Sequence, residues 1–329
     1  MHTTMTMFAA LSGIDQFVVS FQSIVYEALP FVIIGALISG ILEELLPQAM
    51  FAKMIPKNRY LAIAGSALLG LVFPMCECGI VPVMRRLLGK GLPLGCAVAY
   101  MLCAPVINPV VIASTWAAFS GDRSNIDGVT SFQMVALRCG LSFITGFIVG
   151  TIVNRMAVKG VNDLIKVPIK VVALETVEEE AAEAKRPWTQ RVSNIAQVAL
   201  HDFIDITCFL ILGAMLAAFL QTFELVSRVS FLFENPWTAA LTMMAIAVLL
   251  CLCSEADAFV AANMLKVPLS GKLGFLVLGP MFDLKLLLMF TRVFKAKLIV
   301  TIVILLWVII FTLSMSTYYI DRYLRELMR

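Results

Sequence analysis

The sequence predicts an all-α polytopic membrane protein, and three observations support this fold class. Of the 329 residues, 60% are hydrophobic and only 14% are charged, whereas soluble domains carry about 25% charged residues. The mean hydropathy is +0.94. Apolar stretches that approach the roughly 20 residues needed to cross a bilayer recur along the chain. We therefore expect about eight transmembrane helices in two repeated halves of four, with broken or re-entrant helices at the centre.

A motif that occurs twice predicts the two halves. Residues 76–109 and 251–284 align without a gap at a constant offset, 251 − 76 = 175. The positions that coincide are Cys76 with Cys251, Cys78 with Cys253, Pro93 with Pro268, Pro105 with Pro280, and Asn108 with Asp283. Gly35 and Gly213 extend the similarity upstream. Helix interruptions at corresponding places in two halves indicate a transport site near the membrane centre.

The first half is expected to contain four spans. They cover residues 26–46 (lengthened by 17–24), 60–74 with a continuation to 88, 93–119, and 131–153. Proline removes an amide donor, so we expect the third span to break at Pro105 and again at Asn108-Pro109. The fourth contains Gly146 and Gly150, a spacing that lets helices pack closely in lipid.

The second half is expected to repeat this plan. Its spans cover residues 195–223, 237–264, 268–290 and 298–320. We expect breaks after Cys253 and at Gly279-Pro280, and an interfacial anchor at Tyr318 and Tyr319. The predicted organisation is a first transmembrane repeat at 1–153, a hydrophilic cytoplasmic linker at 154–194, and a second repeat at 195–329.

The orientation follows from the basic residues. Placing both termini and the linker in the cytoplasm leaves most Lys and Arg residues inside, as the positive-inside rule favours. If the Cys-x-Cys and proline segments are re-entrant hairpins, each half crosses the membrane an odd number of times and the halves are inverted repeats. The sequence leaves open whether the two repeats are parallel or inverted. The expected location is the bacterial inner (plasma) membrane, with multiple passes.

Ionisable residues inside the apolar segments are candidates for the substrate or ion path. Such a residue costs about 2.5–3.5 kcal/mol at a helix centre on insertion scales, so it should face a cavity or another such residue. The residues concerned are Glu77, Glu255, Asp257, Asp283, Lys285 and Arg138. A buried carboxylate can take up and release a proton, as coupling to a proton gradient requires. The alternative is a structural ion pair, for example of Asp283 with Lys285 or with Arg138.

The cysteine pairs and the prolines complete the candidate path. Thiolates favour soft metals and metalloids, and the thiols of Cys76, Cys78, Cys251 and Cys253 could converge where a helix is broken near Pro74 and Gly79. The alternative is that cysteine acts as a small apolar packing residue. We expect that role for Cys96, Cys103, Cys139 and Cys208. The backbone freed by Pro105 and Pro280, with the oxygens of Asn108 and Asp283, should line the path; a simple packing kink is the alternative.

Several function classes are disfavoured. Only two histidines are present, so no His-rich metal site exists, and we expect neither a resident metal nor a cofactor. No phosphate-binding loop or dinucleotide-binding glycine pattern is present, which argues against ATP hydrolysis. The net charge of +3 is too small to indicate a nucleic-acid partner.

These motifs resemble those of the predicted permease family that includes YraQ and the organoarsenical efflux permease ArsP. The strings that carry the resemblance are residues 74–82, 91–93, 104–109, 253–259 and 275–285. The resemblance covers both halves and implies an inner-membrane permease of about eight spans, not an enzyme. It does not imply a substrate, because the arsenical activity belongs to one branch of the family.

The expected function is therefore a secondary transporter, an exporter of a small solute driven by an ion gradient. A thiol-reactive metalloid such as a trivalent organoarsenical is one candidate solute. A membrane protein that passes electrons or sulfur through the paired cysteines, and a passive channel, are the alternatives. The expected partners are the lipid bilayer and the solute, and a homo-oligomer is left open.

Overall fold

The structure is a computed structural model, and it describes residues 13–45, 56, 58–72, 75–89, 91–120, 129–160, 164–165, 188–221, 233, 235–264 and 267–327. These residues are almost entirely helical and contain no strand, apart from one isolated bridge between Ile165 and Phe294. The helices are α2 (Gly13–Leu45), α4 (Arg59–Leu68), the 3-10 turn η1 (Leu69–Leu71), α5 (Glu77–Gly89), α6 (Leu94–Cys103), α7 (Pro109–Ala118), α9 (Ser131–Gly160), α11 (Trp188–Gln221), α13 (Pro236–Leu250), α14 (Ala256–Asn263), α15 (Leu269–Met281), α16 (Leu284–Val293) and α17 (Ala296–Leu327).

The helices have the length and polarity of a membrane protein. In the described part, four helical stretches are long and apolar enough to cross a membrane, at residues 14–38, 131–158, 269–293 and 296–323. Val300, Ile304 and Val308 form a stripe on α17 and are 55%, 57% and 56% exposed. Apolar side chains exposed at helical spacing suit lipid better than water. The all-α membrane class is therefore supported, whereas the count of eight spans stays a prediction.

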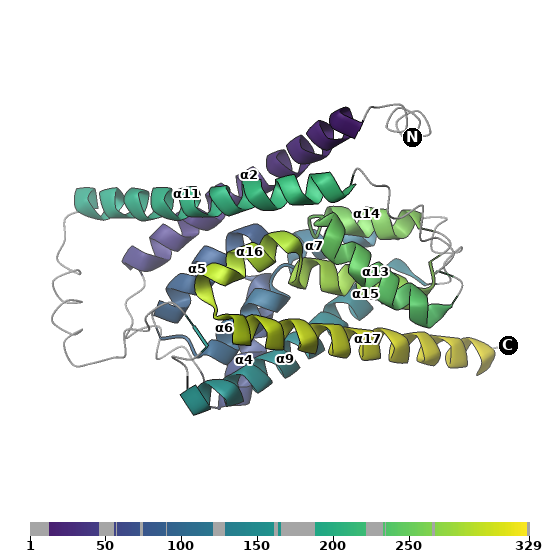
Figure 1. Ribbon diagram of the computed structural model, residues 1–329. Coiled ribbons are helices and arrows are strands. Elements are labelled where there is room, and N and C mark those ends of the chain that lie inside the picture. The colour runs from purple at the N-terminus through teal and green to yellow at the C-terminus, as the bar shows by residue number, and fades with distance from the viewer. Residues whose placement is uncertain are drawn as a thin grey trace.

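Two long helices, α2 and α11, lie against each other and run in opposite directions (Figure 1). Gly40 near the end of α2 faces Ile195 near the start of α11, and Ile24 packs with Ala214. The bundle therefore has two ends. At the linker end α9 stops and α11 starts; at the terminal end α2 starts and α17 stops (Figure 1).

The segment α6–α7 runs as a single broken rod along α9. The contacts, in order, are Ser131 with Phe119, Ser142 with Cys103, and Gly150 with Gly95. The partner numbers fall steadily as the α9 numbers rise, so α6 and α7 continue in one direction, antiparallel to α9. The stretch from 131 to 150 covers about 29 Å at 1.5 Å per residue, which is close to the hydrocarbon thickness of a bilayer. The packing also places Gly150 of the predicted glycine pair directly on Gly95.

By contrast, the segment α4–η1–α5 turns back on itself. Gly70 packs against Ala104 and Ile63 packs beside Gly150, so α4 runs parallel to α6 from the linker end. A tight turn then joins α5 to the start of α6, with the Leu92 amide donating to the Leu87 carbonyl at 3.0 Å. Because α6 starts at the linker end, α5 must return there. The predicted span at 60–88 is thus two short helices that meet between Leu71 and Glu77.

The second half contains a matching hairpin that opens at the other end. Ser270 bonds the Pro236 carbonyl at 3.1 Å, and Gly279 packs against Ala247, so α13 and α15 run parallel. The Trp237 Nε1 donates to the Tyr319 hydroxyl of α17 at 2.9 Å, so α13 starts at the terminal end. Since α15 starts beside the start of α13, α14 must return to that end. The expected break after Cys253 therefore lies within a wider turn from Cys251 to Glu255.

One predicted break is displaced. We expected the span at 268–290 to break at Gly279-Pro280, but α15 continues through both residues to Met281, and the chain becomes extended at Phe282. Pro280 lies in the last turn of α15, so its missing amide affects only a helix that is already ending. The actual boundary is set by Asp283, which caps α16.

The boundaries of the predicted linker also differ from the helix ends. The helix α9 continues to Gly160 and α11 begins at Trp188, so both helices enter the predicted range of 154–194. Residues 166–187, which include the acidic run at 178–180, lie outside the described residues.

Candidate functional site

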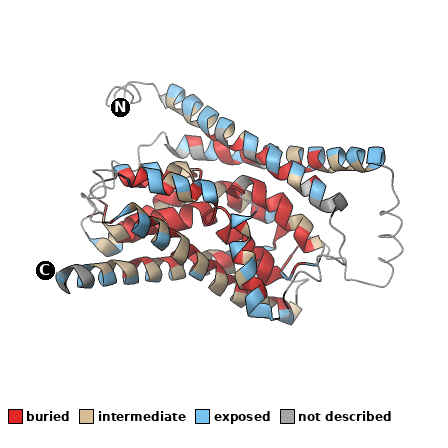
Figure 2. Ribbon diagram, turned by 180° about the vertical axis from the view of Figure 1, so that it is seen from behind, coloured by how far each residue is buried: buried red, intermediate tan, exposed pale blue. Residues whose placement is uncertain are grey.

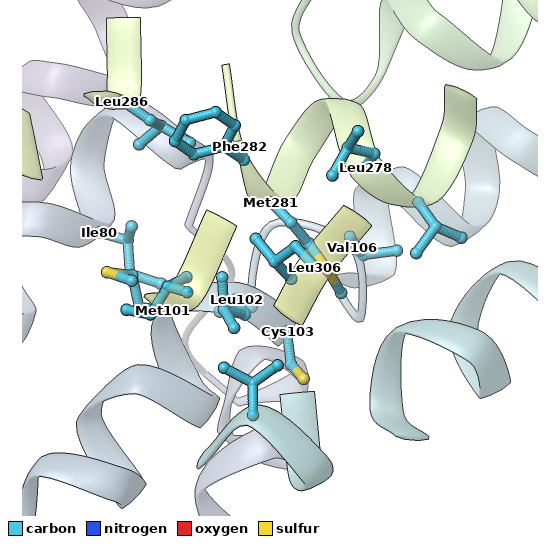
Figure 3. Close-up of a cluster of buried hydrophobic side chains, with 14 of the residues drawn as sticks. Ile80, Met101, Leu102, Cys103, Val106, Leu278, Met281, Phe282, Leu286 and Leu306 are labelled. Carbon is cyan, nitrogen blue, oxygen red and sulfur yellow. The ribbon is translucent and has the colours of Figure 1, made fainter. Parts of the chain in front are cut away.

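The two broken segments meet in a buried apolar cluster at the middle of the bundle. Figure 3 shows side chains from the end of α6 and its break together with side chains from the end of α15 and the start of α16. The labelled residues are Ile80, Met101, Leu102, Cys103, Val106, Leu278, Met281, Phe282, Leu286 and Leu306. Buried residues concentrate in this central region, while the outward faces of α2 and α11 are exposed (Figure 2). The structure thus brings both copies of the motif together.

Asn108 and Asp283, which coincide in the aligned motifs, have the same structural role. The Asn108 Oδ1 accepts from the Val110 amide at 2.9 Å and starts α7. The Asp283 Oδ1 accepts from the Leu286 amide at 2.7 Å and starts α16. Both side chains are buried, and both are N-caps, which satisfy amides that a helix start leaves without partners. One oxygen of each is therefore occupied by its own helix.

A buried charge triad, formed by Glu77, Asp283 and Lys285, joins the two motifs. The Lys285 Nζ lies 3.5 Å from the Glu77 Oε1 and 3.4 Å from the Asp283 Oδ2. All three side chains are at most 3% exposed. The pairing of Asp283 with Lys285 was considered from the sequence; the participation of Glu77, from the first turn of α5, was not. Pro105 and Pro280 are in or beside the breaks but contribute no charge.

A second buried ionic cluster forms around Arg138. Its Nη2 lies 2.8 Å from each carboxylate oxygen of Asp257 and donates to the Ser254 carbonyl at 2.9 Å. Its Nη1 donates to the Thr115 Oγ1 at 2.6 Å. Arg138 on α9 therefore pairs with Asp257 at the start of α14, and not with Asp283 as one sequence-based alternative had it. Additional hydrogen bonds to Thr115 and Ser254 help to offset the cost of burying this ion pair.

A third ion pair escaped the sequence reading. The Arg86 Nη2 lies 3.1 Å from the Asp202 Oδ1, and the Arg86 Nε lies 3.3 Å from Oδ2. Arg86 lies in α5, near the end of the predicted continuation to residue 88, and connects this helix to α11. The available signal was Asp202 itself, an acid within the predicted apolar span at 195–223.

The described motif cysteines are buried. Cys251 lies in the left-handed region with φ 49°, and its thiol donates to the Val248 carbonyl at 3.3 Å. The Cys253 thiol donates to the Glu255 Oε2 at 3.4 Å. Cys76 belongs to the main apolar cluster, while Cys251 packs in a smaller one. The side chain of Cys78 lies outside the described residues, as does Pro74.

The other cysteines fit the packing role only in part. Cys96 and Cys103 are buried and Cys139 is half-buried, whereas Cys208 is exposed on α11. Among the residues that the structure describes, no group of three or more His, Cys, Asp or Glu side chains is arranged to hold a metal ion.

Comparison with known proteins decides the family. A family model described as "Predicted permease" (ArsP_1) matches residues 14–319. The chain belongs to this permease family. It is 37% identical over 293 residues to "UPF0718 protein YcgR" of Bacillus subtilis (strain 168), covering 88% of this chain and 92% of the relative. It is 33% identical over 293 residues to "Putative two-component membrane permease complex subunit" of Streptococcus mutans serotype c (strain ATCC 700610 / UA159), covering 89% and 91%.

The family resemblance expected from the motifs is thus confirmed, and the permease names indicate a membrane transporter rather than an enzyme. No solved structure matches the chain. In this permease the pairs Arg86–Asp202, Arg138–Asp257 and Glu77–Lys285 each connect the first predicted half to the second, so these charged groups lie where the two parts of the chain meet.

Proposed function

We propose that this permease is a secondary transporter whose halves are inverted repeats around one central site. The observation that carries this proposal is the path of the chain. One hairpin, α4–α5, opens at the linker end, and the other, α13–α14, opens at the terminal end. Each is followed by a broken rod, α6–α7 or α15–α16. Broken and re-entrant segments at corresponding places in two halves are typical of a transporter site near the midplane.

The element positions support the same repeat. Helices α2 and α11 start 175 residues apart (188 − 13), as do α6 and α15 (269 − 94). The contacts between halves are reciprocal, because α5 packs on α16 and α14 packs on α7. In this arrangement the eight expected apolar segments comprise six crossings and two re-entrant hairpins, with three crossings in each half.

The basic residues then assign an orientation. At the linker end, side chains in the described part include eight basic ones: Arg59, Arg85, Arg86, Arg155, Arg191, Arg292, Lys295 and Lys297. At the terminal end, Lys272 and Arg322 are the basic side chains that the structure describes. Under the positive-inside rule the linker end is cytoplasmic. The start of α2 and the end of α17 then face the outside of the cell. This proposal differs from our expectation that both termini are cytoplasmic.

The substrate proposal rests on the central groups. The cysteines at the turn 251–255 and the buried acids offer soft and polar ligands in a low-dielectric region, and we infer that the solute is small and thiol-reactive. A trivalent organoarsenical is the candidate class, moved outward at the expense of an ion gradient across the bacterial plasma membrane. The printed name of the Streptococcus relative supports a second subunit as partner for this chain.

The test is flux in proteoliposomes loaded with methylarsenite. If transport is gradient-driven, an imposed pH difference should change the rate or the final distribution of the solute. A thiol-blocking reagent should abolish the transport. A passive channel would give equilibration that ignores the gradient. A thiol redox protein would give no flux but would exchange disulfides with added dithiol. Either of these outcomes would overturn the transporter proposal.

A further inference from the structure

Glu77 is the least well satisfied acid in the permease core. Its side chain is 1% exposed. Its Oε1 meets the Lys285 Nζ at 3.5 Å, and its Oε2 has no hydrogen-bond partner. Burying a carboxylate with one oxygen that has no hydrogen-bond donor disfavours its charged form. A carboxyl group that holds a proton avoids this cost.

Two other buried acids, Asp257 and Asp283, have closer hydrogen-bond donors than Glu77. Asp257 receives two 2.8 Å contacts from Arg138. Asp283 receives the 2.7 Å bond from the Leu286 amide at the start of α16, where the helix dipole also favours a negative charge. Arg138 stays charged at all physiological pH values. These two acids therefore have partners that remain when Lys285 moves, and Glu77 does not.

Lys285 is placed to move between two partners. Its Nζ is almost equally far from the Glu77 Oε1 and the Asp283 Oδ2, at 3.5 and 3.4 Å. Both distances are long for a charge-assisted hydrogen bond, which is usually about 2.7–2.9 Å. The ammonium group thus sits between two carboxylates without closing on either.

We propose that Glu77 is the residue that carries the coupling proton, and that Lys285 exchanges between Glu77 and Asp283 as this proton binds and leaves. A proton from water adds to the Glu77 carboxylate, and no other bond forms or breaks. Lys285 then pairs with Asp283 in place of Glu77. When the proton leaves, Lys285 returns towards Glu77. The inference rests on the proposed transport function and names its coupling ion and site.

The position of the triad lets this exchange affect both halves. Glu77 starts α5, part of the linker-end hairpin, while Lys285 lies in the first turn of α16, beyond the break of the second half. Gly213 of α11 packs directly against the Lys285 Cα and Cγ. A change of partner by Lys285 therefore alters a contact between α5 and α16, and it also changes the packing of the Lys285 side chain against Gly213 of α11.

Other charged groups surround the triad and must be considered in any pH response. Glu255 and Asp257 from the second hairpin act electrostatically on the acids of this region, and Asp202 of α11 is paired with Arg86 of α5. The titratable side chains on α6 and near the hairpin turns are Cys76, Cys96, Tyr100, Cys103, Cys251 and Cys253. The helix α2 contacts α5 through Gly35, which packs against Gly79 and carries no titratable group. Among the acids named, Glu77 differs in two ways. Its Oε2 is buried without a donor, and its Oε1 is bonded by neither a helix amide, as in Asp283, nor a guanidinium, as in Asp257.

The experiment is infrared difference spectroscopy of the full-length protein in lipid between about pH 5 and about pH 9, an interval that lies above the ordinary carboxyl pKa of about 4. We expect a protonated-carboxyl C=O band that titrates in the wild type and is absent from Glu77→Gln. Glu255→Gln, which changes an acid outside the triad, should keep it. Persistence of the band in Glu77→Gln, or its absence from the wild type at every pH, would overturn the proposal.

A second variant protects the test against misfolding. Glu77→Asp keeps a carboxyl group but shortens the side chain, so the band should remain and shift. An identical band in Glu77→Asp and the wild type would also count against Glu77. The spectroscopy needs no solute, so it separates the two proposals. A titrating Glu77 without methylarsenite flux refutes the transporter proposal alone, and gradient-driven flux without a titrating Glu77 refutes this inference alone.

Discussion

The Arg138 Nη2 on α9 lies 2.8 Å from both carboxylate oxygens of Asp257 on α14, and this ion pair connects the first half of the chain to the hairpin of the second. Arg138 also bonds Thr115 on α7 and the Ser254 carbonyl. One guanidinium group therefore holds three elements, α7, α9 and the start of α14. The alternative sequence-based pairing with Asp283 would have left Asp257 buried and unpaired.

Removal of one partner of this pair should be strongly destabilising. Asp257→Asn leaves a buried guanidinium without its counter-charge, which typically costs about 3–5 kcal/mol. Arg138→Lys should also be destabilising, although it keeps the positive charge, because an ammonium group cannot bond Asp257, Thr115 and Ser254 at once. The measurement is the thermal midpoint of the purified protein. The control is Thr145→Val, which removes a buried hydroxyl bonded only to the Leu141 carbonyl of its own helix; an equal loss in both would contradict the role of the pair.

The triad makes a different prediction for Lys285. Lys285→Met leaves Glu77 and Asp283 both buried without a cation, so stability should fall by about 3–5 kcal/mol. The double variant Lys285→Met with Glu77→Gln should recover most of this, because Asp283 keeps its cap on the Leu286 amide. A double-mutant cycle on thermal midpoints measures the coupling. Additive effects would mean that Lys285 and Glu77 do not interact.

Glycine positions offer a graded test of helix packing. A Cβ on Gly35 would lie 2.7 Å from the Gly79 Cα, and a Cβ on Gly213 would lie 2.9 Å from the Lys285 Cγ. Gly35→Ala should therefore be the more damaging, because backbone yields less than a side chain. A Cβ on Gly65 meets nothing within 4 Å, so Gly65→Ala should be neutral or stabilising by up to about 1 kcal/mol. The order of the three thermal midpoints checks this, and a costly Gly65→Ala would contradict it.

Cys251 can be tested without disturbing the backbone. Its φ of 49° is costly for a side chain with a Cβ, by about 1–2 kcal/mol, and glycine adopts this conformation freely. Cys251→Gly should be at least as stable as Cys251→Ala. If the thiol binds the solute, Cys251→Gly should still lose methylarsenite transport. The control is Cys96→Ser with Cys103→Ser, which removes two buried thiols of α6; equal transport losses would make the cysteines structural.

The sequence predicted the apolar segments and the repeat landmarks because both depend on local residue types. The breaks at Pro105 and at Asn108-Pro109 are examples, since a proline acts within one helical turn. The direction of each helix could not be predicted in this way. It depends on which helices pack together, as in the steady succession of contacts along α9.

The ion pairs were beyond the sequence for a similar reason. Glu77 and Lys285 are 208 residues apart, and Arg138 and Asp257 are 119 apart. The need for partners followed from the cost of charge in an apolar segment, but their identity depended on tertiary packing. Pro280 shows the opposite error, because a strong local signal predicted a break three residues before Asp283, the cap that starts α16.

The proposed orientation predicts that residues at opposite ends of the bundle face opposite sides of the membrane. Trp188 at the start of α11 and Tyr323 near the end of α17 are 68% and 66% exposed. With a cytoplasmic linker end, Tyr323→Cys in intact cells should react with an impermeant maleimide, and Trp188→Cys should react only after permeabilisation. The unsubstituted protein, whose motif cysteines are buried where they are described, gives the background. Reaction of both residues from the same side would require an even number of crossings between α11 and the end of α17, and would contradict the inverted repeat. The opposite pattern, with Trp188→Cys labelled from outside, would keep the repeat and reverse only the orientation.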